Sequence, residues 1–183
     1  KVLHSLGGKP IVQHVLETAK SLVCEHIFVV TSPGLANHPL FQDVTTVVQE
    51  HPTGTADAVK KVLPYLPKEI EDVIIICGDT PLLTPRTLEK LNQSKADLSL
   101  IGIPVRDQSE TYGRIICNQQ GMPQKIVEYK DATEQQRCLP WANSGVYKIK
   151  VSLLNELLPH IQAQNASKEY YLTDLVDLSY QKG

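Results

Sequence analysis

Hydrophobic and polar positions along the chain follow two periods that alternate from segment to segment. Short runs of β-branched residues bounded by turn residues predict strands, whereas apolar residues three or four positions apart predict amphipathic helices. The predicted strands are residues 26–32, 45–49, 72–77, 98–105, 113–117, 125–129 and 143–150. The predicted helices are residues 10–22, 56–66, 85–91, 151–161 and 170–180.

Two helices carry clear start signals. Pro10 fits the first turn of a helix, where its missing N–H would be unbonded anyway. Thr84 and Pro85 are typical of an N-cap and a first helical residue, and Leu88 and Leu91 should then face inward. The apolar stripe of the first helix consists of Ile11, Val15, Ala19 and Leu22.

The order of the elements indicates the fold class. Residues 72–77 are continuously apolar after the first position, which is typical of a strand buried on both faces of a mainly parallel sheet. Strands that alternate with helices predict an α/β protein with a Rossmann-like, three-layer, open mixed sheet. Ligands of such sheets bind beyond the carboxyl ends of the strands.

Composition narrows the classes of function. The chain has 183 residues, so one domain is expected. Its net charge is −2, so we expect no long-range attraction to nucleic acid or anionic lipid. It contains no apolar run of membrane-spanning length and does not begin with a signal peptide. We therefore expect a cytoplasmic protein without nucleic-acid or membrane partners.

The four cysteines and six histidines are widely scattered. They form neither a C-x-x-C pair nor an H-E-x-x-H motif, which argues against a zinc site or a disulfide framework. Each cysteine is expected to be a small buried or half-buried residue. The cysteines are Cys24, Cys77, Cys117 and Cys138.

A carboxylate follows the most apolar predicted strand, in the segment Ile76–Cys77–Gly78–Asp79–Thr80. At a strand tip, a partly desolvated carboxylate needs a cation or several N–H donors to remain charged. Gly78 lets the main chain approach a ligand closely. Asp79 is therefore either a Mg²⁺ ligand or the cap of a helix or turn.

Two further groups of polar residues lie at strand ends. Gln49 begins a loop that ends with Gly54 and Thr55 at a predicted helix start, where N–H groups can bind an anion or a base edge. The alternative is an ordinary loop with Thr55 as N-cap. Glu128 and Asn143 could bind a polar ligand, although a solvated glutamate and a turn-forming asparagine are the simpler interpretations. The segment Tyr112–Gly113–Arg114 lies near the same strand edges.

In order and spacing, these segments resemble the N-terminal domain of the bifunctional N-acetylglucosamine-1-phosphate uridylyltransferase / glucosamine-1-phosphate N-acetyltransferase family. The resemblance covers essentially the whole chain and implies a fold of the nucleotide-diphospho-sugar transferase type. One departure is Cys77, where the family more often has Tyr or Asn. The matching segments are KVLHSLGGKPIVQHV, QEHPTGTADAV, ICGDTPLL, YGRI, IVEYKDAT, NSGV and EYYLTD.

The resemblance also implies roles for individual residues. Lys1 and Asp79 would be catalytic, with Lys1 on phosphate and Asp79 as the Mg²⁺ ligand. The implied nucleotide-binding residues are Lys1, Gln49, Gly54, Thr55, Cys77 and Gly78. The implied sugar-binding residues are Gly113, Glu128 and Asn143.

The implied activity is the Mg²⁺-dependent transfer of UMP from UTP to N-acetylglucosamine-1-phosphate, which supplies cell-wall and lipopolysaccharide precursors. We expect residues 1–183 to be part of that domain, with the first strand, the Gly-rich phosphate loop and a second metal-binding asparagine outside the chain. Family members form trimers through an acetyltransferase domain that consists of hexapeptide repeats. No such repeat occurs in this sequence. The alternatives are a related nucleotidyltransferase of other specificity and a non-catalytic fragment.

Overall fold

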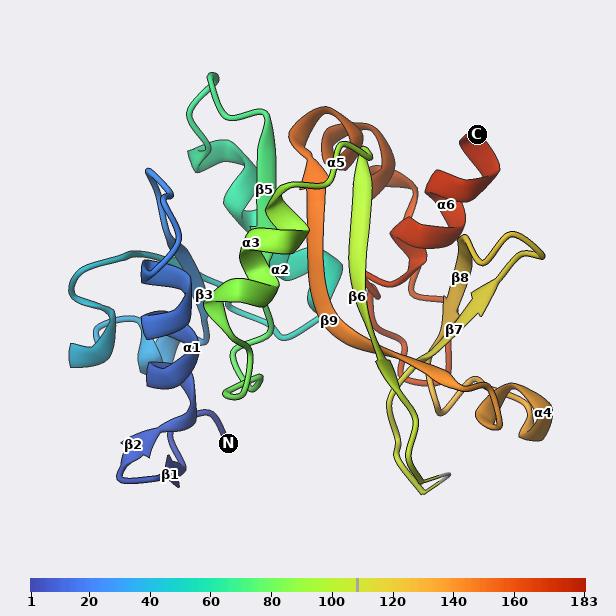
Figure 1. Cartoon of the computed structure of the whole chain (residues 1–183). Helices are drawn as coiled ribbons and strands as arrows, with labels where there is room; N and C mark the ends of the chain where they lie inside the picture. The colour runs from blue at the N-terminus through green and yellow to red at the C-terminus, as the bar shows by residue number, and fades with distance from the viewer. Residues whose placement is uncertain (108) are drawn as a thin grey trace.

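The computed structural model describes residues 1–107 and 109–183 of the chain. Within them, helices and strands alternate up to β6, and three successive strands (β6–β8) and two successive helices (α5 and α6) follow in the second half (Figure 1). The strands are β1 (Ser5–Leu6), β2 (Lys9–Pro10), β3 (Phe28–Thr31), β4 (Thr45–Val48), β5 (Asp72–Ile75), β6 (Leu98–Pro104), β7 (Arg114–Cys117), β8 (Pro123–Val127) and β9 (Trp141–Lys150). The α-helices are α1 (Ile11–Lys20), α2 (Thr55–Val62), α3 (Pro85–Asn92), α4 (Glu134–Arg137), α5 (Val151–Leu157) and α6 (Asp174–Lys182).

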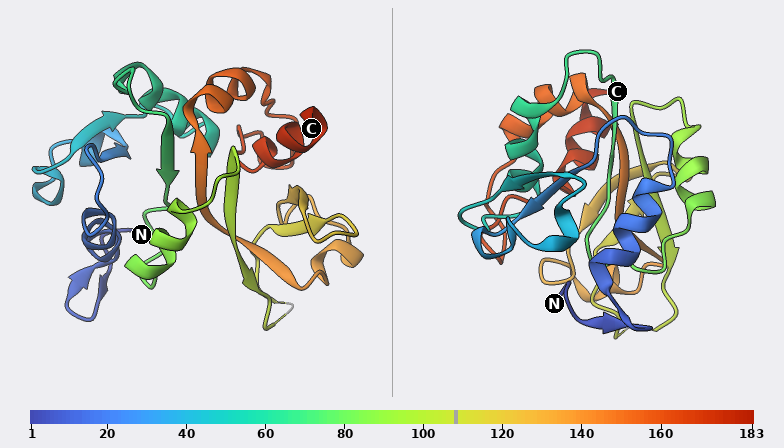
Figure 2. Two further views of the ribbon diagram at one scale, coloured as in Figure 1. Left: turned by 45° about the horizontal axis from the view of Figure 1, so that its top comes forward. Right: turned by 90° about the vertical axis from the view of Figure 1, so that its left-hand side faces the viewer.

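The predicted three-layer arrangement is confirmed. Helix α3 covers one face of the larger sheet, and α2, α5 and α6 cover the other (Figure 2). Adjacent side chains of β9 point to opposite faces of the sheet: Val146 packs with Leu88 of α3, whereas Tyr147 packs with Leu154 of α5. All four side chains are buried, so the strand is covered on both sides.

The long strand β9 organises the larger sheet. It pairs antiparallel with β5 on one side and with β6 on the other, and its first part also meets β7, which pairs with β8. The expectation of mainly parallel neighbours for β5 was therefore wrong. Burial between two helix layers accounts for its apolar run, whatever the direction of the strand beside it.

A second, parallel sheet contains β3 and β4, and α1 packs against it through Val12 and Leu16. The protein thus has the mixed strand directions that the sequence predicted. Within residues 1–107 and 109–183, β3 pairs only with β4, and β5 pairs only with β9. One edge of each of these two strands is consequently unpaired.

Several local predictions are confirmed and others were wrong. Thr84 caps α3, where its hydroxyl accepts a hydrogen bond from the Thr87 N–H at 3.3 Å. Residues 170–173 were predicted as the start of a helix, but α6 begins only at Asp174. Helix α4 was not predicted, although Thr133 and Gln136 form a capping box there.

The cysteines are more exposed than expected. Cys24, Cys117 and Cys138 are exposed, and only Cys77 is partly buried. Within the described residues, no helix combines the length and the apolarity that a membrane span requires.

Candidate active site

Asp79 lies in a turn just beyond β5, with its carboxylate facing the N-terminal residue. The Lys1 ammonium donates to the Asp79 carboxylate at 2.7 Å, and this hydrogen bond, together with the negative charge, raises the pKa of Lys1 above its ordinary value. Within the part of the chain that the structure describes, no main-chain N–H donates to this carboxylate, so the interpretation of Asp79 as a cap is wrong. The two residues that the resemblance marks as catalytic therefore lie together.

Two residues before Asp79, the Cys77 side chain fills the space beside Gly145 of β9. Its thiol donates to the Gly145 carbonyl oxygen at 3.4 Å, and a Cβ atom on Gly145 would lie 2.6 Å from the Cys77 sulfur. Burial raises the pKa of the Cys77 thiol to about 11, so the group stays protonated at neutral pH. This contact joins the tip of β5 to β9.

The three residues implied in sugar binding also come together, from three segments. The Asn143 N–H donates to the Gly113 carbonyl at 2.8 Å, and a Cβ on Gly113 would lie 3.2 Å from a carboxylate oxygen of Glu128. Glycine thus leaves the space that the carboxylate occupies. The Asn143 amide accepts from the Gly145 N–H at 3.0 Å and donates to the Tyr147 hydroxyl at 2.6 Å, which fixes its orientation.

Glu128 is a largely buried carboxylate rather than a solvated one. Burial raises its pKa, and the negative charges of Asp131, Asp174 and Glu169 act in the same direction. The opposing influence is a hydrogen bond from the Thr173 hydroxyl at 3.2 Å. A buried carboxylate with so little compensation is typical of a functional site.

Glu128 lines a cavity of about 410 Å³ that also exposes polar groups of several other segments. Thr111 lies on the loop before β7, Lys130 follows β8, and Ser167 and Tyr171 precede α6. These residues were missed as candidates, since they lie outside regular elements and have no spacing pattern. The EYYLTD segment was the available signal, but it was assigned to a helix.

The loop that carries Gln49, Gly54 and Thr55 forms the third part of the site. The Gln49 amide donates to the Gly54 carbonyl at 3.1 Å and to the Asp57 carboxylate at 2.8 Å, leaving its own carbonyl oxygen without a partner among the described residues. Gly54 is the N-cap of α2, with a φ of 129°, and Thr55 is the first helical residue. The interpretation of Thr55 as N-cap is therefore wrong.

Arg114 supports the sugar-binding segment from inside the protein. Its side chain is 0% exposed, and the guanidinium donates to the carbonyl oxygens of Glu110, Tyr112 and Arg137. It also lies over the Tyr129 ring, at 5.6 Å from the ring centroid. These contacts tie the loop before Gly113 to the end of α4.

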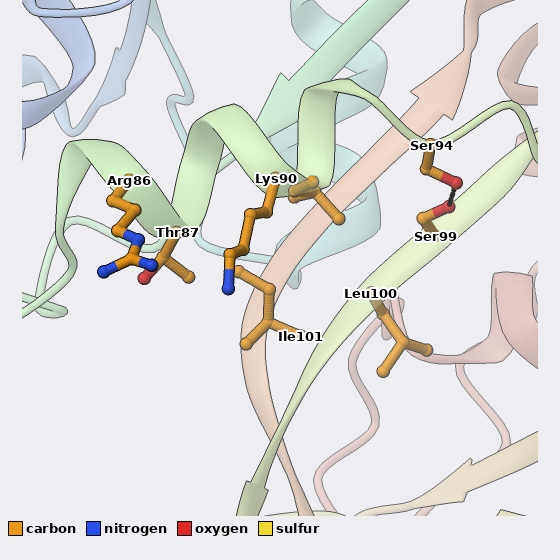
Figure 3. A pocket seen from close by; sticks show the side chains of 8 residues that line it. Arg86, Thr87, Lys90, Ser94, Ser99, Leu100 and Ile101 are labelled. Atoms are coloured by element: carbon orange, nitrogen blue, oxygen red, sulfur yellow. Dashed lines mark hydrogen bonds between the residues drawn. The ribbon is translucent and has the colours of Figure 1, made fainter.

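A second cavity, of about 700 Å³, lies elsewhere, between α3 and β6 (Figure 3). Arg86 and Lys90 of α3 border it on one side, and Leu100 and Ile101 of β6 on the other. None of the candidate residues lines it. Of the candidate residues, Glu128 lines the smaller cavity, where this largely buried carboxylate and several polar groups converge, so that cavity is the candidate ligand site.

The chain can supply one hard oxygen ligand to a divalent cation. Asp79 is 37% exposed and already faces a cation, the Lys1 ammonium. Within residues 1–107 and 109–183, no group of three or more His, Cys, Asp or Glu side chains could hold a metal ion. Mg²⁺ is commonly bound by one or two carboxylates together with substrate phosphates and water, and Asp79 fits that arrangement.

Known proteins resemble this chain over its whole length. The chain is similar to the bifunctional protein GlmU of Paracoccus denitrificans, with 39% identity over 188 residues that cover 100% of this chain and 42% of the relative. The same protein of Cellvibrio japonicus is 38% identical, with 100% of this chain and 41% of the relative covered. The chain thus spans about two fifths of the length of these relatives.

The fold also has a counterpart among solved structures. A crystal structure of UDP-glucose pyrophosphorylase complexed with UDP-glucose matches 100% of this chain and 79% of its own, with a TM-score of 0.74 and 15% identity. At that identity, the match describes the fold alone. The model of the MobA-like NTP transferase domain matches residues 1–145, and the chain belongs to this family of nucleotidyltransferase domains.

Proposed function

We propose that this chain forms part of an enzyme that transfers UMP from UTP to N-acetylglucosamine-1-phosphate, giving UDP-N-acetylglucosamine and pyrophosphate. The observation that carries the proposal is the pairing of Lys1 with Asp79 in the turn after β5, two residues from the Cys77–Gly145 contact that joins this turn to β9. Relatives named bifunctional protein GlmU match the chain over its whole length, which supports the same activity. The product would enter cell-wall and lipopolysaccharide precursor synthesis.

The reaction would be an in-line displacement. A phosphate oxygen of the sugar phosphate forms a bond to the α-phosphorus of UTP, and the bond from that phosphorus to the bridging oxygen breaks, releasing pyrophosphate. The attacking phosphate is ionised at neutral pH, so no general base is required. Catalysis then depends on positioning and on charge neutralisation.

Each group of site residues has a task in this scheme. Lys1 would offset phosphate charge, and Asp79 would hold Mg²⁺, which supplies further neutralisation of the phosphates when bound. Gln49, with Gly54 and Thr55 at the start of α2, would hold the base. Cys77 and Gly78 would shape the tip of β5 beside the nucleotide.

The sugar would lie against the buried carboxylate. Glu128 would accept hydrogen bonds from sugar hydroxyl or amide groups, with Gly113 and Asn143 on either side. Among the described side chains, the Thr173 hydroxyl is the donor to this largely buried carboxylate, so hydrogen-bond donors on the sugar would stabilise its charge.

The most direct test is Asp79→Asn in the full-length protein. This change keeps the size of the side chain and removes its charge, so we expect pyrophosphate release to fall about 10²–10⁴-fold with an unchanged fold. Asp43→Asn is the matched control, since Asp43 is a surface carboxylate paired with Lys20 away from the site. Near-normal turnover of Asp79→Asn with Mg²⁺ would contradict the metal-binding role.

A second substitution tests the sugar side. Glu128→Ala should weaken binding of the sugar phosphate more than binding of UTP, because Glu128 lies in the cavity and not in the loop around Gly54. Calorimetric titration of the two ligands separately measures this. Equal weakening of both would argue against the sugar-binding role.

A related nucleotidyltransferase is the second candidate, and the fold shared with UDP-glucose pyrophosphorylase favours it. Competition assays with UTP, CTP and dTTP, and with different sugar phosphates, distinguish the two. We also propose that a strand outside residues 1–183 pairs with β3 and β5, whose unpaired edges support this. If residues 1–183 fold with full stability alone, this strand is not needed.

A further inference from the structure

The segment Tyr170–Thr173 joins two parts of the site that are far apart in the sequence. The Tyr170 N–H donates to the Thr53 carbonyl at 2.8 Å, and the Tyr170 carbonyl accepts from the Ala56 N–H at 2.9 Å. The Leu172 N–H donates to the Thr55 hydroxyl at 2.9 Å. Three hydrogen bonds therefore tie this segment to the loop at the start of α2.

At Gly54, the main chain of the loop lies in direct contact with the main chain of Tyr170. A Cβ atom at this position would lie 2.4 Å from the Tyr170 carbonyl oxygen, so the two main chains touch directly. Nothing flexible lies between them that could absorb a displacement. Movement of the loop around Gly54 must therefore move Tyr170–Thr173 as well.

Thr173, the last residue of this segment, contacts the sugar-side carboxylate. It precedes α6 as N-cap, a position where threonine usually accepts a hydrogen bond from the helix, but its side chain makes no such bond. Its hydroxyl instead donates to Glu128 at 3.2 Å. Thr173 is 5% exposed and lies next to the core residue Leu172, so its position is well fixed.

The environment of Glu128 makes this one donor important. In addition to burial, the charges of Asp131 after β8, Asp174 in α6 and Glu169 before α6 raise the pKa of Glu128, and all three groups are acidic. Lys130 lines the same cavity, but its ammonium donates to the Ser167 hydroxyl at 3.3 Å. Among the described residues, Thr173 is the side chain that donates to Glu128.

We infer that Thr173 is a positioning residue that orients Glu128 for the sugar phosphate, and that Tyr170–Thr173 couples this carboxylate to the nucleotide loop. This inference rests on the proposed function for the identity of the two ligands. Its consequence is that nucleotide binding at the loop around Gly54 strengthens sugar-phosphate binding at Glu128, and the reverse.

Thr173→Val and Thr173→Ser test the inference in the full-length protein. Valine keeps the shape and removes the hydroxyl, so the dissociation constant of N-acetylglucosamine-1-phosphate should rise about tenfold or more. The affinity for α,β-methylene-UTP alone should change by less than about threefold, since the loop keeps its main-chain contacts. Serine retains a hydroxyl and should restore sugar-phosphate binding.

Two further readouts separate positioning from general destabilisation. The Thr173 hydrogen bond lowers the pKa of Glu128, so its loss should move the low-pH limb of sugar-phosphate binding to higher pH, and serine should move it back. The strengthening of sugar-phosphate binding by α,β-methylene-UTP should also diminish in Thr173→Val. Calorimetry across pH, with and without the nucleotide, measures both effects.

The outcomes are distinguishable from failure of the proposed function. If the unmodified protein neither binds the sugar phosphate nor releases pyrophosphate, the proposed function is wrong. If it does both, and Thr173→Val retains its affinity, pH limb and coupling, the inference about Thr173 is overturned. Equal weakening of both ligands with a lowered melting temperature in both variants would also overturn it, because it indicates a structural role only.

Discussion

The contact between Cys77 and Gly145 allows a quantitative prediction about how the tip of β5 fits against β9. Gly145 has a φ of 76°, and a Cβ atom there would lie 2.6 Å from the Cys77 sulfur. Alanine in this backbone conformation costs about 1–2 kcal/mol. Forcing an extra carbon into the filled space costs about 1–3 kcal/mol more, so Gly145→Ala should destabilise the protein by about 2–5 kcal/mol.

The two terms can be separated with a second substitution. Cys77→Ala removes the sulfur and, as a small deletion in a partly buried site, should alone cost about 1 kcal/mol. In the double variant, the new methyl group occupies the space that the sulfur left, so only the backbone term of about 1–2 kcal/mol remains. The double variant should therefore be more stable than the sum of the single effects predicts, by about 2–4 kcal/mol, which is the overpacking cost plus the cost of Cys77→Ala alone.

Urea denaturation of the full-length protein and the three variants measures this cycle. Additivity within about 0.5 kcal/mol would show that the sulfur does not restrict Gly145, and the description of the contact would be wrong. Gly34→Ala is a suitable control, since a Cβ there meets nothing within 4 Å.

Two other predictions concern the thiols and a buried hydroxyl. Three cysteines are exposed and should react rapidly with iodoacetamide at pH 8, namely Cys24, Cys117 and Cys138. Cys77, with a pKa of about 11, should be labelled only at much higher pH or after unfolding. If intact-mass analysis finds that all four cysteines are labelled rapidly, this prediction is wrong. The Thr31 hydroxyl is buried without a hydrogen-bond partner among the described residues. Thr31→Val should thus stabilise the protein by about 1 kcal/mol, and a lower midpoint of urea unfolding would show that the hydroxyl has a partner.

The sequence by itself determined the features that depend on local order along the chain. Thr84 and Pro85 start α3 as predicted, because capping and a fixed φ act within one helical turn. The apolar run before Cys77 similarly placed Asp79 beyond the end of β5. A motif that combines a buried strand with a glycine and a carboxylate can be found without a structure, since its parts are adjacent.

Only the tertiary structure decided the features that depend on partners far away in the chain. Residues 170–173 are not helical because their main-chain groups bond to residues 53–56, and the Leu172–Thr55 bond spans 117 positions. The bond between Thr173 and Glu128 spans 45 positions, and β5 pairs with residues of β9 that lie even farther away in the sequence, as in the pair Asp72–Lys150. Periodicity reports how much of a segment is buried, but it does not report which segment covers it. Strand direction, the buried state of Glu128 and its hydrogen bond from Thr173 are therefore set by folding, which brings separate segments into hydrogen-bonding distance.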